Sequence, residues 1–213
     1  MFNPESIILK EGALNNEIFL TLTGNVEMLS ADEGVNCTLY AGTFIGEHSG
    51  LHKKPSPYTY RTTNFVQALR IPSSLFAVFV KQNDLYEEME LMEVRRELLN
   101  RMPLFSEAIS YSLKNKISHE MEARKIAVGD LISDDEDALY IVSSGVLKAA
   151  GSEVQLGVAD YFGEERSILE RDPAAVRQYE VVEEGELYLI PGELVREIPI
   201  LLWKVMEGLE KQS

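Results

Sequence analysis

The sequence predicts a mainly β protein with flanking helices, built as two copies of one small domain. The first observation is local: short runs rich in Ile, Val, Tyr, Phe and Thr alternate with Gly, Asn, Asp and Pro roughly every 8–12 residues, as in antiparallel sandwiches and rolls. Residues 58–69 and 179–190 are examples of such runs. The second observation is that ordered landmarks in the first half of the chain return in the second half.

Three landmarks recur: an apolar run that ends in Gly, an aromatic–apolar–Gly–Glu run, and an Ile-Pro pair. They lie at Gly24 and Gly145, at Glu47 and Glu164, and at residues 71–72 and 190–191. The corresponding offsets are 121, 117 and 119 residues. Because the order is kept and the offset hardly changes, we expect a duplication, with one domain at residues 1–100 and a second at residues 101–213.

Helical spacing of apolar residues appears between the copies and at the end of the chain. Residues 83–101 carry Leu85, Met89, Met92 and Leu99 at this spacing, and a second stripe contains Phe105, Ile109, Leu113 and Ile117. Pro199 suits the first turn of a last helix. We therefore expect a helical joint between the two domains.

Composition excludes several classes of function. The 213 residues include 35 acids against 20 bases, for a net charge of −15, which disfavours contact with a phosphate backbone. The single cysteine, Cys37, leaves no internal disulfide to form and fits a reducing compartment. The apolar runs are too short to span a bilayer. We expect a cytoplasmic protein with no nucleic-acid or membrane partner.

Taken together, the landmarks resemble the cyclic nucleotide-binding domain, and the resemblance covers nearly the whole chain twice. It rests on the Gly after the apolar run, the Gly-Glu pair and the closing Ile-Pro pair. It implies two eight-stranded jelly rolls (double-stranded β-helices), each with one helix before the roll and two after it. It also implies a non-enzymatic regulatory module, in which ligand binding is transmitted through the helices to a partner or attached domain.

The resemblance also assigns site residues within a cassette, the segment that begins at each Gly-Glu pair. Glu47 and Glu164 match the carboxylate that binds the ribose hydroxyl, and Gly46 and Gly163 match the cassette backbone. Trp203 is the candidate base cap. The implied ligands are cyclic AMP and cyclic GMP.

Both cassettes lack the Arg that pairs with the cyclic phosphate in this family, nine or ten residues after the Glu. Substitutes of suitable charge or polarity are Lys53, Lys54, Ser56 and Arg171, while Arg61 and Arg177 lie on the following strands. The first loop carries one acid and two lysines, whereas residues 164–177 carry a net charge of −1, so the first copy is the better phosphate candidate. The alternative is a degenerate fold used as a protein-interaction scaffold or for a different small ligand.

The first copy is short at its start. Only seven residues precede Ile8, but the second helical stripe begins at Phe105, 27 residues before the matching Ile132. We therefore expect the first roll to lack its leading helix and strand, with a missing N-terminal domain, a protein partner or a second copy of the chain covering the open edge.

Enzyme and metal sites are not expected. The sequence contains no Gly-x-Ser-x-Gly, Walker or dinucleotide-binding glycine run. Glu47, His48 and His52 cluster in the first cassette, but they lack the His-x-His pair that metal-binding jelly rolls use. The run Asp134–Asp137 is too short for a calcium loop.

Overall fold

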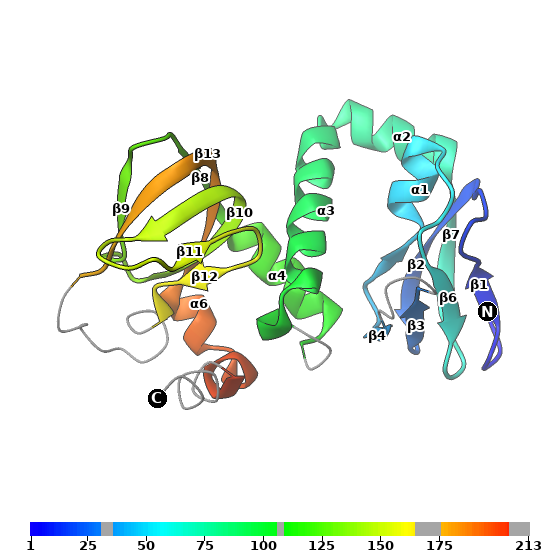
Figure 1. Cartoon of the computed structure of the whole chain (residues 1–213). Coiled ribbons are helices and arrows are strands. Elements are labelled where there is room, and N and C mark those ends of the chain that lie inside the picture. Colours follow the sequence, from blue (N-terminus) through cyan, green and yellow to red (C-terminus); the bar gives the residue numbers. More distant parts are fainter. Residues whose placement is uncertain (31–35, 106–108, 165–175, 205–213) are drawn as a thin grey trace. The chain divides into compact units, whose positions relative to one another are not determined.

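The computed structural model describes residues 1–30, 36–105, 109–164 and 176–204. The chain divides into two compact units (Figure 1). Unit 1 comprises Met1–Glu93 and Ser110–Leu113, and unit 2 comprises Val94–Ile109 and Lys114–Ser213. The boundary between Glu93 and Val94 falls within helix α3 (Tyr86–Arg101).

Unit 1 contains two antiparallel sheets. One has the order β1 (Ile7–Leu9), β6 (Thr59–Thr62), β3 (Val26–Leu29), β4 (Asn36–Leu39). The other has the order β5 (Phe44–Ile45), β2 (Glu17–Thr23), β7 (Gln67–Pro72). Alternate strand residues point inward and fill a core that contains Phe19, Val26, Leu39, Ile45 and Tyr60.

Three helices of unit 1 share a second apolar cluster. They are α1 (Glu47–His52), α2 (Ser73–Gln82) and the start of α3. Buried Ile18 of β2 packs there with Phe76 of α2, and Leu51 of α1 and Met89 of α3 lie against the same cluster. The three helices therefore pack through one shared set of apolar side chains.

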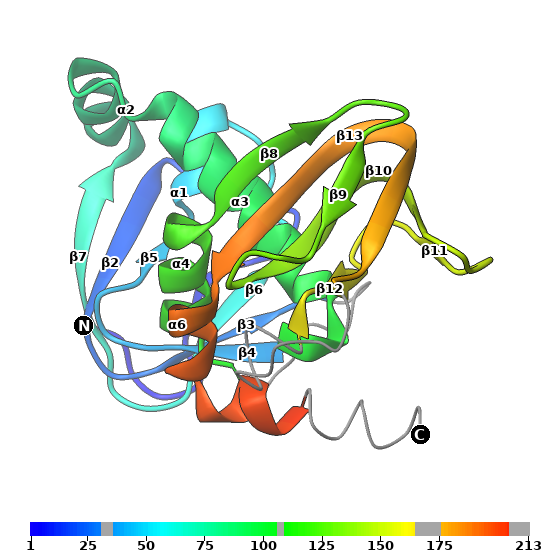
Figure 2. The ribbon, with the colours of Figure 1, turned by 90° about the vertical axis from the view of Figure 1, so that its left-hand side faces the viewer.

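Unit 2 is built around two long strands, β10 (Ala138–Ala149) and β13 (Gln178–Pro191). Its other strands are β8 (Glu122–Ile126), β9 (Leu131–Ser133), β11 (Gln155–Leu156) and β12 (Tyr161–Phe162). The sheet order is β11-β10-β13-β8, with β12 paired to β10 and β9 to β13 (Figure 2). The flanking helices are η1 (Pro103–Phe105), the part of α4 (Tyr111–Glu120) from Lys114 on, α6 (Gly192–Arg196) and a helical stretch at 199–204.

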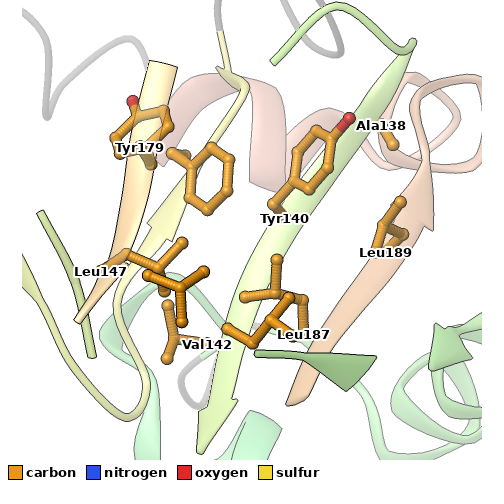
Figure 3. Close-up of a cluster of buried hydrophobic side chains, with 10 residues drawn as sticks. Ala138, Tyr140, Val142, Leu147, Tyr179, Leu187 and Leu189 are labelled. Carbon is orange, nitrogen blue, oxygen red and sulfur yellow. The ribbon is translucent and has the colours of Figure 1, made fainter. Parts of the chain in front are cut away.

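A stack of aromatic rings forms the centre of the unit 2 core (Figure 3). The ring of Phe162 lies 4.6 Å from that of Tyr140, almost parallel to it, and 4.2 Å from that of Tyr179. Leu187 and Leu189 of β13 pack in the same cluster. Burial of such large rings makes this stack a major source of apolar stabilisation in the unit.

The strand register of unit 1 returns in unit 2 at the offsets found in the sequence. Four pairs of unit 1 correspond one by one to four pairs of unit 2. In unit 1 they are Ile18↔Ile71, Phe19↔Ile45, Val26↔Thr62 and Val26↔Leu39. In unit 2 they are Leu139↔Ile190, Tyr140↔Phe162, Leu147↔Val181 and Leu147↔Leu156. The two units therefore share one hydrogen-bonding plan.

The predicted count of eight strands per roll needs correction. Within the described residues, unit 1 has seven strands and unit 2 has six. In unit 2, β10 runs through the positions that β2 and β3 occupy in unit 1, and β13 runs through those of β6 and β7. The β10–β13 pair has register shifts between Val142 and Leu147. At these bulges the two strands bend and continue, whereas the corresponding strands of unit 1 are interrupted.

The helix predicted within residues 83–101 is confirmed as α3, which begins at Tyr86 because Asp84, with a positive φ of 55°, lies between α2 and α3. A second helix prediction needs correction. The stripe predicted to begin at Phe105 is not one helix: residues 103–105 form a 3-10 turn after Pro103, and α4 begins at Tyr111. Phe105, Ile109 and Ile117 are nevertheless buried, so the apolar spacing reports burial correctly.

None of the described helices is long and apolar enough to cross a lipid bilayer.

The outer edge of β7 differs from that of β13. In unit 2, β8 pairs with β13 from Gly185↔Ile126 to Leu189↔Glu122. In unit 1, the bridge Phe2↔Val66 occupies the place of the Gly185↔Ile126 pair, and among the described strands β7 pairs with β2 only. Among the described strands, none pairs with the remaining outward-facing backbone groups of β7 in the way that β8 pairs with β13.

Hydrogen exchange tests this difference. Amides in residues 68–71 should exchange at least about ten-fold faster than those in residues 187–190, because opening at an unpaired edge costs less free energy than opening between two strands. Mass spectrometry with peptide resolution measures both segments in one sample. Equal protection of the two segments would contradict the prediction and would show that another chain covers β7.

Candidate functional site

The first cassette, defined here as residues 46–56, begins where β5 ends. Gly46 turns the chain with a φ of 76° and precedes α1. A Cβ at this position would lie 2.6 Å from Nδ2 of Asn15 and 3.0 Å from Cδ2 of Leu9. Both the backbone conformation and the available space therefore require glycine here.

Asn15 holds the cassette against the preceding loop. Its side-chain amide donates to the carbonyl oxygens of Gly46, at 3.0 Å, and Glu17, at 2.9 Å. The hydroxyl of buried Ser49 donates to the amide oxygen of Asn15 at 2.8 Å. These bonds satisfy the buried polar groups at the start of α1 and fix its position on unit 1.

The end of the first cassette is also tied down. Lys53 has a left-handed φ of 52°, and the backbone N–H groups of Lys53 and Lys54 both donate to the carbonyl of Ser49. Both lysines are exposed residues. Because both backbone N–H groups are already hydrogen-bonded, only the side-chain ammonium groups of these lysines can contact an anion.

Ser56 has a structural position. It is only 2% exposed, and its hydroxyl donates to the carbonyl of Tyr58 at 2.7 Å. Its backbone N–H donates to the carbonyl of Ala13, and its carbonyl accepts from Gly12. Its N–H and its hydroxyl proton are therefore both used in hydrogen bonds within the fold.

Glu47 is half-buried and lies near enough to buried Tyr60 for its charge to act on the phenol. Burial raises the pKa of Tyr60 well above its usual value, and the charge of Glu47 raises it further, followed by Tyr111 and Glu93. Tyr60 therefore stays neutral beside Glu47 at physiological pH. A carboxylate in such surroundings can accept hydrogen bonds from ligand hydroxyl groups.

The corresponding part of unit 2 begins in the same way. Gly163 has a φ of 84°, and a Cβ there would lie 2.6 Å from the carbonyl oxygen of Ala138. The side chain of Glu164 is 16% exposed, and one of its oxygens lies 4.0 Å from the guanidinium of Arg177. Burial raises the pKa of Tyr161, and the negative charge of Glu164 raises it further.

Arg177, predicted to lie on a following strand, directly precedes β13. Its backbone N–H donates to the carboxylate of buried Asp134 at 2.8 Å. Its side chain opposes the rise in the pKa of Tyr179, which burial causes first and Asp134 reinforces. No spacing rule links Glu164 to a residue 13 positions later, so only the fold could bring the two side chains together.

Three further residues named from the sequence are Arg171, Trp203 and Arg61. Arg171 lies outside the described residues. Trp203 lies in the helical stretch 199–204 and is 59% exposed. In unit 1, Arg61 pairs with Glu27 at 2.8 Å and lies 3.5 Å from Glu5, so its charge is already opposed.

Residues 1–83 match the family model of the cyclic nucleotide-binding domain. The matched residues contain both sheets of unit 1 and the whole first cassette. Within the curated proteins, the chain is 23% identical over 131 residues to a potassium channel, AKT2/3, of Arabidopsis thaliana, and 23% identical over 141 residues to AKT2 of rice, Oryza sativa. These alignments cover 60% and 64% of this chain but only 14% of each channel.

Solved structures with the same fold match nearly the full length of the chain. The regulatory domain of Toxoplasma gondii PKA with cAMP has a TM-score of 0.51 at 15% identity, over 100% of this chain and 84% of that one. The cAMP-bound PfPKA-R has a TM-score of 0.55 at 15% identity, over 99% and 77%. The regulatory subunit of a cAMP-independent protein kinase A from Trypanosoma brucei has a TM-score of 0.50 at 14% identity, over 99% and 77%.

The glycine that opens the matched domain's cassette can be tested directly. Gly46→Ala should lower the free energy of unfolding by about 1–2 kcal/mol for the left-handed backbone, plus about 1–3 kcal/mol for the overlap with Asn15. Gly12→Ala is the matched control, because Gly12 has a φ of 77° but no atom within 4 Å of the place that a Cβ would take. Urea unfolding of both variants measures the difference, and equal losses would show that packing around Gly46 is loose.

Alkaline titration tests the buried tyrosine beside the second cassette. Burial, reinforced by Glu136, raises the pKa of Tyr140 to about 12. Between pH 10 and that value the unfolded chain releases a proton that the folded chain keeps, so stability should fall as the pH rises. Tyr140→Phe should make this fall shallower, whereas Tyr40→Phe, at an exposed position, should leave the slope unchanged. An unchanged slope in Tyr140→Phe would contradict the assignment.

Proposed function

We propose that this chain is a non-enzymatic regulatory module with two cyclic-nucleotide-binding-like units, the first at residues 1–100 and the second at residues 101–213. In this proposal unit 1 binds a cyclic nucleotide, and its helices carry the bound state to a partner or to an attached domain. The observation that supports it most strongly is the shared strand register of the two units, which puts Gly46-Glu47 and Gly163-Glu164 at the same point of each roll.

The architecture of the first cassette supports ligand binding in unit 1. Glu47 follows a glycine whose position is held by Asn15, so its carboxylate has a defined place from which to bind a ribose hydroxyl. Lys53 and Lys54 are exposed at the other end of α1. Their charges would substitute for the family's arginine, as point charges rather than a bidentate fork, which predicts weaker phosphate binding than an arginine provides.

Unit 2 is the weaker binding candidate. Arg177 already lies near Glu164, at 4.0 Å, and interacts through its backbone with Asp134. A ligand that used Glu164 would compete with this cation or would have to use it for its phosphate. We therefore propose a mainly structural role for the second cassette.

The shared apolar cluster of unit 1 supports a transmission route. Leu51 of α1 and Met89 of α3 pack against the same buried residues, Ile18 and Phe76. A ligand that shifts α1 would repack this cluster and so displace α3, whose last residues, from Val94 on, belong to unit 2. Packed cores change between discrete arrangements, which makes such a cluster suitable for a switch.

The structural neighbours leave the ligand open. Two are described with cAMP, and one is the regulatory subunit of a kinase described as cAMP-independent. At 14–15% identity these matches concern the fold. The choice of ligand must come from the cassette residues of this chain.

Calorimetry with cyclic AMP and cyclic GMP tests the proposal. We expect saturable binding of at least one of them at one site per chain. Glu47→Gln should weaken it by about 10-fold or more, because a hydrogen bond to a charged group contributes about 1.5–3 kcal/mol. Lys53→Gln with Lys54→Gln should weaken it further and reduce its salt dependence.

The matched control is Lys81→Gln, at an exposed residue near the end of α2, which should leave the affinity unchanged. Glu164→Gln should likewise have little effect if unit 1 holds the ligand. Absence of binding at millimolar nucleotide would refute the sensor proposal and favour the alternative of a scaffold or a different small ligand.

A further inference from the structure

Two histidines and a glutamate converge on one side of α1 in unit 1. His48 and His52 lie one helical turn apart on α1, and Glu90 comes from α3. One nitrogen from each imidazole and one carboxylate oxygen all lie within 4.8 Å of one another. Nε2 of His52 is 2.5 Å from Oε1 of Glu90, and Nδ1 of His48 is 4.0 Å from the same oxygen.

His52 occupies the centre of this cluster. Its side chain is 12% exposed, its ring centroid lies 4.4 Å from that of His48, and its Nδ1 is hydrogen-bonded to the hydroxyl of Tyr86 at 2.9 Å. Among the described residues its buried Nε2 has no hydrogen-bond partner, so the short contact with Glu90 lacks the angles of a hydrogen bond. In the tautomer that carries its proton on Nδ1, this N–H donates to the Tyr86 oxygen and Nε2 has the lone pair that binds a metal.

The three donors match a known class of metal site in composition and spacing. Two imidazoles and one carboxylate are ligands that Zn²⁺ accepts, with a fourth position left for water. In a tetrahedral site with metal–nitrogen bonds of about 2.0–2.1 Å, neighbouring donor atoms lie roughly 3.3 Å apart. The contacts of 2.5 Å and 4.0 Å fall on either side of that value, so small side-chain rotations suffice.

An ion can reach the three side chains from solvent, and Tyr86 holds the His52 ring in place. The side chains of His48 and Glu90 are 33% and 44% exposed, which leaves a path for an ion and room for water. The hydroxyl of Tyr86 bonds the far nitrogen of the His52 ring, and the Tyr86 ring meets it edge-on, so the donor nitrogen stays turned toward Glu90.

We propose that His48, His52 and Glu90 bind a divalent transition-metal ion of the zinc class and so clamp α1 to α3 in unit 1. The sequence alone disfavoured a metal here because the cassette lacks a His-x-His pair. The third ligand lies 38 residues beyond His52, on another helix. The inference goes beyond the proposed function and does not depend on it, since these ligands bind a metal whether or not a nucleotide is present.

Metal titration of the tag-free, chelator-treated chain tests the proposal. Zn²⁺ should bind saturably with one equivalent per chain, measured by competition with a chromogenic chelator. Co²⁺ should give the intense visible absorption of a four-coordinate site, and Zn²⁺ should displace it. This spectrum reports the ligand geometry independently of any nucleotide.

Matched variants locate the ligands. His52→Gln and Glu90→Gln should each weaken Zn²⁺ binding by about 100-fold or more, and Tyr86→Phe by about 10-fold, as loss of a group that orients a ligand does. The controls make the same substitutions at exposed residues: His119→Gln on α4 and Glu87→Gln on α3 should bind as the parent does.

Circular dichroism and thermal unfolding without metal establish that each variant is folded. Folded His52→Gln or Glu90→Gln that binds Zn²⁺ as tightly as the parent would overturn the proposal. So would a loss of binding in His119→Gln as large as that in His52→Gln, or the absence of saturable binding by the parent.

Discussion

The antiparallel pairing of β2 with β7 in unit 1, and of β10 with β13 in unit 2, positions the rest of each unit. On its other side, β2 pairs with β5 in the register Phe19↔Ile45, and β10 pairs with β12 in the register Tyr140↔Phe162. Each of these pairs sets where the next glycine must turn. A slip of one residue would reverse which side chains face the core, so the buried faces hold the register firmly. The cassettes thus inherit their position from strand pairing.

The six-residue helix α1 carries both the cassette glutamate and two of the proposed metal ligands. Its first turn carries Glu47 and is held by Asn15, while its last turn carries His52 toward α3. The polar groups between them, such as the hydroxyl of Ser49, are used for fixing the helix. Between its two ends, α1 packs through Leu51 against the apolar cluster that Met89 of α3 also contacts.

The two units use the same plan with different electrostatics. In unit 1 the lysines near the cassette are exposed and Tyr60 stays neutral beside Glu47. In unit 2 the cation near the glutamate comes from Arg177, whose backbone is bonded to a buried aspartate. Because the chain has a net charge of −15, an anion is attracted only where local cations outweigh the surrounding acids.

The sequence by itself determined the offsets of 117–121 residues between the paired landmarks and the glycine turns at Gly46 and Gly163, because glycine turns and short apolar runs are local signals. The strand register that matches those offsets came from the structure. The sequence did not reveal that β10 and β13 continue through bends where unit 1 breaks its strands, nor that left-handed Asp84 lies between α2 and α3, because bulges and single left-handed residues leave weak local patterns. Only the tertiary structure buried Ser56, brought Arg177 to Glu164 and placed Glu90 beside His52. These contacts join residues far apart in the chain, and they depend on how helices and strands pack, which no spacing in the sequence encodes.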